Sequence, residues 1–169
     1  NSERDLILSP RCSMVTRNTG GMLYVSDLTT GQVRDAMLDD VAEFTRLMDG
    51  LNNIDFLAPL FPENVSPATR ELWVLLKMME NTDKHINIRA FSRNNIRDLL
   101  KMSAVVAGGK AQLKNRPVIS MLESPISPLK FPEIFVEALL RCGEFGIPFE
   151  ICPAPNLGAT GPITLAGAL

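Results

Sequence analysis

Two stretches in the second half of the chain carry residue types that could do chemistry. Glu123 and Ser124 directly follow the apolar run PVISML, where a carboxylate could balance a cationic substrate or orient a polar group. Residues 156–164 (NLGATGPIT) form a glycine-containing turn, and backbone N–H groups of such a turn at a helix N-terminus can bind anions. The structural alternatives are a helix-capping glutamate and glycines that only permit the bend.

Cysteine and histidine offer little chemistry in this sequence. The three cysteines, Cys12, Cys142 and Cys152, are odd in number and widely spaced, which favours reduced thiols in the cytoplasm over a disulfide framework. Cys152 ends an apolar run without a nearby base, so we expect a small buried residue. His85 has no partner at metal-ligand spacing and precedes its strand, which predicts a structural role and no metal site. Catalytic residues stay unassigned.

Composition indicates an ordinary globular domain. The 169 residues are 46% hydrophobic and 21% charged, with a net charge of −2. Lys and Arg never cluster beyond pairs, which argues against a nucleic-acid partner or an anionic membrane surface. No apolar run reaches the roughly 18 residues of a membrane span. The sequence starts at Asn1 and stops at Leu169 inside a helix-like run, so we expect a fragment of a longer polypeptide.

The first 38 residues predict an N-terminal extension, residues 1–38, that carries a β-hairpin. Met22–Leu28 alternates apolar and polar residues, Thr29–Gln32 supplies a glycine turn, and Val33–Leu38 follows. Residues 39–169 would then form the main domain.

Four apolar runs alternate with helical patterns in the main domain. The expected strands are 54–60, 86–91, 117–122 and 147–152. The expected helices begin at Asp40, which forms a capping box with Glu43, at Ser66-Pro67, at Ser92 and at Pro132, and another opens at Pro162.

The spacing of these units predicts a parallel α/β sheet. Unit starts at Asn53, His85, Arg116 and Ile147 are 32, 31 and 31 residues apart, the size of a βα repeat. We expect an incomplete (β/α) barrel of TIM type with about four units, because no glycine-rich fingerprint of the rival open doubly wound sheet follows the first strand. The loops after the strands, 59–62, 92–94, 123–129 and 153–164, would line its active-site mouth.

The final stretch also carries a family resemblance. PAPNLGATGPITLAGAL resembles the strand–loop–helix of the trimethylamine methyltransferase family, the corrinoid-dependent methyltransferases. DLTTGQVRDAMLDDVAEFTRLMDGLNNIDF and SPISPLKF resemble other parts of that family in the same order, so the resemblance spans most of residues 21–169.

The resemblance implies a TIM barrel that moves a methyl group from a tertiary or quaternary amine to cob(I)alamin. The cobalamin would belong to a partner corrinoid protein, and this chain would bind no cofactor directly. The full-length parent would be a cytoplasmic homo-oligomer in one-carbon metabolism such as methanogenesis. The pyrrolysine of some members would lie beyond Leu169, so both trimethylamine and glycine betaine stay open as substrates.

A pocket for such an amine needs carboxylate or aromatic groups and in-line positioning of the methyl group. Position in the expected barrel, rather than the family, makes Glu123, Phe91 and Phe131 candidates, with Ser124 beside them. The turn would shape the pocket floor or the surface that meets the corrinoid, through Asn156, Gly158, Thr160 and Thr164. A non-catalytic homologue that binds an amine or serves in assembly is the alternative. A barrel lyase or aldolase would need a Schiff-base lysine, which neither Lys84 nor Lys130 supplies.

Overall fold

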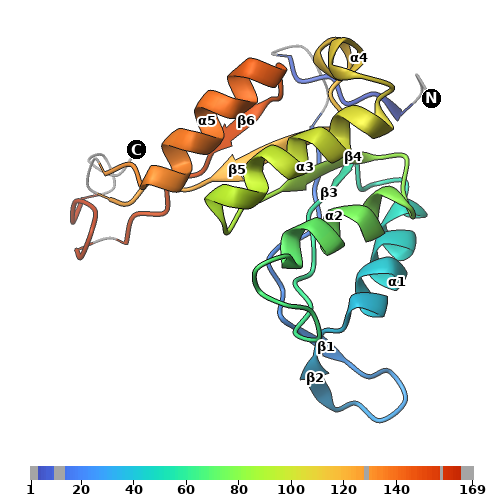
Figure 1. Ribbon diagram of the computed structural model, residues 1–169. Helices are drawn as coiled ribbons and strands as arrows, with labels where there is room; N and C mark the ends of the chain where they lie inside the picture. Colours follow the sequence, from blue (N-terminus) through green and yellow to red (C-terminus); the bar gives the residue numbers. More distant parts are fainter. Residues whose placement is uncertain (1–3, 10–13, 128–129, 157, 165–169) are drawn as a thin grey trace.

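The chain forms a four-stranded parallel sheet with its helices packed on one side (Figure 1). This computed structural model describes residues 4–9, 14–127, 130–156 and 158–164. The strands are β1 (Tyr24–Ser26), β2 (Val33–Asp35), β3 (Phe56–Leu57), β4 (His85–Ile88), β5 (Ile119–Glu123) and β6 (Phe149–Ile151). The helices are α1 (Leu38–Asp49), α2 (Arg70–Met79), α3 (Arg93–Val106), α4 (Lys110–Asn115) and α5 (Glu133–Phe145).

The sheet follows chain order, β3-β4-β5-β6, and all neighbours are parallel. Helices connect each pair of strands, as parallel pairing requires. This confirms the four predicted strands, the helix predicted between each consecutive pair of them and the mixed α/β class. Helix α4, between α3 and β5, was not predicted, because its six residues follow a glycine pair and are too few to show a helical periodicity.

Several predicted boundaries are wrong by a few residues. Strand β3 keeps two of the seven residues expected, and Pro59 beyond it has no N–H for a ladder. Helix α2 begins at Arg70 rather than at Pro67, after a turn. Asp40 does not cap with Glu43; its carboxylate accepts a hydrogen bond from Met37 N at 2.7 Å, as the third helical residue of α1.

The hydrophobic core lies between the sheet and the helices. Aliphatic strand residues pack there against helical ones, the largest fully buried of which include Leu57, Leu75, Ile88, Ile96, Leu99, Leu100, Ile119 and Met121. Cys142 of α5 lies in this core, where burial raises the pKa of its thiol to about 12. Cys152 follows β6 and is exposed, so the prediction of a buried residue there was wrong.

The segment before β1 lies along the free edge of β3. Asp55 N donates to Thr16 O at 3.0 Å, and the side-chain amide of Asn18 bonds both backbone groups of Ala58 at 2.8 Å. Gly20 is pressed against the same residue: a Cβ there would lie 2.5 Å from the Cβ of Ala58. The segment therefore acts as an irregular fifth strand and is positioned by β3.

The predicted hairpin is confirmed. Strands β1 and β2 pair antiparallel with Tyr24 opposite Asp35. The Asp27 carboxylate accepts hydrogen bonds from Thr29 N and Thr30 N at 2.9 and 2.8 Å, and these bonds lower its pKa. The turn is thus stabilised by its own first residue.

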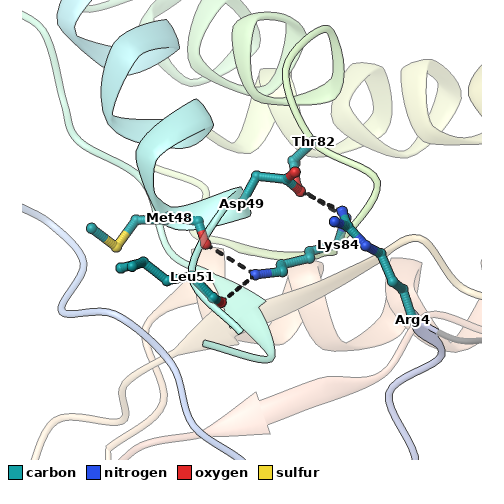
Figure 2. A network of polar contacts seen from close by, with 6 residues as sticks. All are labelled: Arg4, Met48, Asp49, Leu51, Thr82 and Lys84. Atoms are coloured by element: carbon teal, nitrogen blue, oxygen red, sulfur yellow. Dashed lines mark hydrogen bonds and ion pairs between the residues drawn. The ribbon is translucent and has the colours of Figure 1, made fainter. Parts of the chain in front are cut away.

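The amino edge of the sheet is held by a polar cluster, which we call the amino-edge cluster: Arg4, Met48, Asp49, Leu51, Thr82 and Lys84 (Figure 2). Lys84 Nζ donates to the carbonyls of Met48 at 3.0 Å and Leu51 at 2.8 Å. The first carbonyl belongs to the last turn of α1 and the second follows its C-terminal end, where a cation is favourable. His85 lies at the same edge, its Nδ1 3.3 Å from Pro117 O, and burial lowers its pKa, in line with the predicted structural role.

Asp49 joins the N-terminal segment to this edge. Its Oδ1 accepts hydrogen bonds from Arg4 Nη1 at 2.7 Å and Thr82 Oγ1 at 2.6 Å (Figure 2). Burial works to raise the pKa of Asp49, but the bonds from Thr82 and Arg4 outweigh it and the pKa is lowered. Asp49 is therefore an ionised carboxylate with close partners.

Candidate functional site

A cavity of about 420 Å³ opens at the carboxyl edge of the sheet, and we call it the carboxyl-edge cavity. Its wall comes from the segment before β1, the stretch from the end of β3 to α2, and the ends of β4 and β5. The lining residues are Arg17, Gly20, Gly21, Leu23, Ala58, Pro59, Phe61, Arg70, Asn87, Ile88, Arg89, Phe91 and Leu122. Ligands of parallel α/β proteins bind at this edge, in cavities of this size. A second and larger cavity, of about 540 Å³, lies along the surface of α3 and α5, and its described lining contains no residue from the end of a strand.

Three arginines line the carboxyl-edge cavity, and their carboxylate partners stand outside its wall. The closest N···O distances are 3.7 Å for Arg17–Glu150, 3.3 Å for Arg70–Glu63 and 3.4 Å for Arg89–Glu123. The remaining arginine ion pairs between described residues are all 3.0 Å or shorter. The buried Nε of Arg70 has no hydrogen-bond partner among the described residues. Among the described residues, Arg70 thus leaves one buried donor without a partner, while Arg17 also donates a hydrogen bond to Asn87 Oδ1.

Glu123 lies outside the carboxyl-edge cavity and contacts its lining residue Arg89. The last residue of β5, it is 2% exposed, and its Oε1 accepts a hydrogen bond from Ala90 N at 3.1 Å. Alternation along β5 places it on the helix-facing side with Met121. Burial raises the pKa of Glu123, and the Arg89 guanidinium beside it opposes that rise. Glu123 therefore positions Arg89 and the β4–α3 loop.

A second buried carboxylate, Glu71 of α2, fixes the same loop. Its Oε1 accepts hydrogen bonds from Phe91 N at 3.2 Å and Ser92 N at 3.1 Å. Ser92 is the N-cap of α3, as predicted, but its side chain makes no capping bond, so Glu71 reaches in from the neighbouring helix. The ring of Phe91 meets Phe61 edge to face, with centroids 4.8 Å apart. Two aromatic rings are thus held together beside the arginines.

A polar row crosses the sheet face that points away from the helices. Asn87 Nδ2 donates to Ser120 Oγ at 2.9 Å and to Glu150 Oε2 at 3.3 Å. Arg17 closes the row by donating to Asn87 Oδ1. The sequence left the direction of Glu150 open, and the structure places it on this polar face, with the partners that hold Arg17.

The predicted site residues lie in three separate places: at the carboxyl-edge cavity, at the start of α5 and in the turn after β6. Phe91 lines the carboxyl-edge cavity, and Glu123 reaches it through Arg89. Ser124 follows Glu123 directly but is not among the described lining residues. Phe131 is 58% exposed before α5, and its ring packs on Phe135 at 5.0 Å.

The predicted turn forms an exposed structure of its own. The N–H groups of Ala159, Thr160 and Gly161 donate to Asn156 O at 3.0–3.1 Å, and Thr160 Oγ1 accepts from Asn156 N at 3.0 Å. These N–H groups are thus used in hydrogen bonds within the turn and do not point outward as an anion site would require. Gly158 has a φ of 77°, which the bend requires. Thr164 is exposed, and the helix expected from Pro162 falls largely on residues outside the described part of the chain.

Sequence reasoning missed the arginines and Glu71. Arg89 follows β4, but the strand was expected to continue to Phe91, so Arg89 was taken for a mid-strand residue. Arg17 lies in a segment without periodicity, and Glu71 and Arg70 lie in a helix. A correct strand end would have revealed Arg89 by position alone.

The described residues contain no group of three or more metal-ligating side chains. Likewise, no described helix combines the length and apolar character that crossing a bilayer requires.

Comparison with known proteins identifies relatives of one kind. The family model described as Trimethylamine methyltransferase (MTTB) matches residues 1–169. The chain is 32% identical over its whole length to Trimethylamine methyltransferase MttB of Desulfitobacterium hafniense, covering 34% of that protein. It is 29% identical to Glycine betaine methyltransferase of the same species, over 82% of this chain and 29% of that protein. Trimethylamine methyltransferase MttB of Methanosarcina barkeri is 27% identical over 80% of this chain and 28% of its own length.

The chain therefore spans about a third of the length of the curated relatives it matches. The resemblance expected from residues 21–169 extends over the whole sequence. The chain belongs to the trimethylamine methyltransferase family.

Proposed function

We propose that the full-length protein containing this chain moves a methyl group from a tertiary or quaternary amine to the cob(I)alamin of a corrinoid protein. The observation that carries the proposal is family membership along all 169 residues. Relatives named for trimethylamine and for glycine betaine support a methylated amine as the donor.

In this proposal the four parallel strands are consecutive strands of a (β/α) barrel. The sequential order β3-β4-β5-β6 supports it, because a barrel adds each strand beside the last. The polar row of Asn87, Ser120 and Glu150 would then face the barrel interior, and the helices would form part of the outer ring.

The reduced cobalt of the partner supplies the nucleophile, so this chain needs to bind and orient the amine. The paired rings of Phe61 and Phe91 offer aromatic surface beside the carboxyl-edge cavity, and a methylated ammonium group is attracted to such surface. Glu123 holds the loop that carries Phe91. We assign no catalytic residue within this chain. Asn156, Gly158, Thr160 and Thr164 are proposed as contact surface for the corrinoid protein, because their turn is exposed beyond β6.

Reconstitution tests this function. The full-length protein is mixed with its corrinoid protein in the Co(I) state and with trimethylamine, glycine betaine, carnitine or proline betaine in turn. We expect at least one amine to abolish the Co(I) absorbance and to appear as its demethylated product. An unchanged spectrum with all four, in the presence of demonstrated amine binding, would instead support a non-catalytic binding protein.

A further inference from the structure

The loop between β4 and α3 is held through its backbone by carboxylates of other elements. Ala90 N donates to Glu123 Oε1, on β5, at 3.1 Å. The next two N–H groups, those of Phe91 and Ser92, donate to Glu71 Oε1, in the first turn of α2, at 3.2 and 3.1 Å. Three consecutive amides thus fix the path of this loop from outside it.

The placement of Glu71 indicates more than a contribution to stability. The residue is fully buried, and it reaches from the first turn of α2 to the N-terminus of α3, where negative charge is favourable. However, its Oε2 has no hydrogen-bond partner among the described residues, and a buried polar atom left unpaired costs stability. Proteins accept such costs mainly at functional sites.

Phe91 is the cavity residue whose position depends on this backbone. It is 55% exposed, and its ring contacts Phe61, which is 5% exposed, edge to face. A ring so exposed is constrained less by packing than a core ring, so the backbone largely decides where its face lies. The Arg89 guanidinium lies 5.8 Å from the ring centroid, so this ring already attracts a cation.

The guanidinium groups of the cavity wall each have a carboxylate near them. The N···O distances are 3.3–3.7 Å for Arg17, Arg70 and Arg89, and Arg17 also donates a close hydrogen bond to Asn87 Oδ1. The aromatic ring of Phe91, rather than these groups, is therefore the part of the wall that suits a methylated nitrogen.

We propose that Glu71 is a positioning residue for amine binding. By accepting the N–H groups of Phe91 and Ser92, it fixes the Phe91 ring on Phe61 as the aromatic wall of the carboxyl-edge cavity. The inference rests on the proposed function and adds to it a residue that touches neither the amine nor the cobalt. Because Glu71 acts through Phe91, the two residues should be energetically coupled in binding.

Calorimetry on the full-length protein, without its corrinoid protein, measures this role. The probes are trimethylamine and glycine betaine, which carry the same three N-methyl groups. Glu71→Ala should weaken the binding of both by about three- to thirtyfold, the range of a contact between a cation and an aromatic ring. Glu71→Gln keeps an acceptor oxygen and should bind both within about twofold of wild type. Unchanged affinities in folded Glu71→Ala protein, or a wild type that binds neither amine, would overturn the proposal.

A double-mutant cycle shows whether Glu71 acts through the ring. Phe91→Leu alone should weaken binding by a similar factor, and adding Glu71→Ala to it should weaken binding by less than about twofold more. Fully additive losses would overturn the assignment, because a general loss of structure adds to the loss of the ring.

Met78→Ala is the control for lost stability. Met78 is a buried residue of the same helix, about two turns beyond Glu71, and its truncation leaves a cavity in the core. Its unfolding midpoint should fall while amine affinity stays within about twofold of wild type. An equal loss of affinity in Met78→Ala would assign the effect to destabilisation and refute the role of Glu71. If Glu71→Ala does not fold, Glu71→Asp decides, since it withdraws the carboxylate from both N–H groups by one methylene.

The two proposals fail in different ways. Amine binding that depends on Glu71, without loss of Co(I) absorbance, would refute the methyl transfer and leave the positioning role standing. Methyl transfer with amine affinities that Glu71→Ala does not change would refute the positioning role and leave the transfer standing.

Discussion

The two edges of the parallel sheet hold charged side chains in contrasting ways. In the amino-edge cluster, Asp49 and Lys84 meet their partners at 2.6–3.0 Å (Figure 2). At the carboxyl edge, the three cavity arginines stand 3.3–3.7 Å from their carboxylate partners, and Arg17 also donates a close hydrogen bond to Asn87 Oδ1. The close contacts at the amino edge join separate elements of the chain, whereas the arginines of the carboxyl edge line a cavity and meet their carboxylates at longer range.

The carboxylates of the two edges, the partly buried Asp49 and the buried Glu123, also differ in pKa. Hydrogen bonds lower the pKa of Asp49, while burial raises the pKa of Glu123. An ionised Asp49 therefore favours the fold, and an ionised Glu123 costs it stability. We expect four substitutions to separate the edges, with effects that decrease in the following order.

Removing Glu71 should cause the largest change in stability. Glu71→Ala leaves the N–H groups of Phe91 and Ser92 without their acceptor, at about 1–2 kcal/mol each, so we expect a loss of about 2–4 kcal/mol in the free energy of unfolding. Glu71→Gln keeps an acceptor oxygen and should lose less than half of that. Chemical denaturation of the full-length protein measures both, and equal losses would show that the acceptor does not matter.

At the amino edge, Lys84→Met should reduce stability and leave binding intact. Two hydrogen bonds to carbonyls at and just after the C-terminal end of α1 are lost, so we expect a loss of about 1–2 kcal/mol in the free energy of unfolding, measured by denaturation. Lys77→Met is the control, because Lys77 makes an exposed ion pair with Glu80 worth at most about 0.5 kcal/mol. A loss of amine-dependent methyl transfer in the full-length Lys84→Met protein would break the separation between the edges.

The contribution of Asp49 should depend on pH in a definite direction. Its lowered pKa means that its stabilisation is complete above the ordinary Asp pKa and is lost as pH falls through the folded-state value. Asp49→Asn should therefore cost about 1 kcal/mol near pH 7 and progressively less below pH 4. Thermal unfolding of both proteins across pH 3–7 gives the difference, and a pH-independent cost would be the contrary result.

Glu123 should show the opposite and smallest dependence. Because burial raises its pKa, the stabilisation by the protonated acid is present below the ordinary Glu pKa and is lost as pH rises. Relative to wild type, Glu123→Gln should thus gain stability between pH 4 and 7, by less than about 1 kcal/mol, since Arg89 offsets part of the cost. The same pH series tests this, and a relative loss with rising pH would mean that the ion pair with Arg89 dominates.

The order of strands and helices was predictable because it depends on local patterns. Apolar runs and cap residues such as Ser92 and Pro132 mark elements within a few residues of their true ends. The residues that line the cavity could not be predicted, because their positions depend on strand ends known to within one residue. Ending β4 three residues earlier than expected turns Arg89 from a strand residue into a cavity residue.

Long-range partners were beyond local patterns altogether. Arg17 meets Asn87, 70 residues away, only because the N-terminal segment aligns with β3. Likewise, Glu71 caps a helix from another helix, 21 residues from Ser92. Neither contact produces a periodic pattern in the sequence. The position of Glu123 at a strand end, by contrast, was predictable because an apolar run directly precedes it.

The alignment of the N-terminal segment with β3 has a consequence for the order of folding. The hydrogen bonds between Thr16 and Asp55 close a loop of 39 residues, which is slower than forming a hairpin or one strand–helix unit. We therefore expect Arg17 to reach the cavity only after the sheet beside it exists. An intermediate in which α2, β4 and α3 are native would protect its core amides from hydrogen exchange and still lack the wall of the carboxyl-edge cavity that Arg17 supplies.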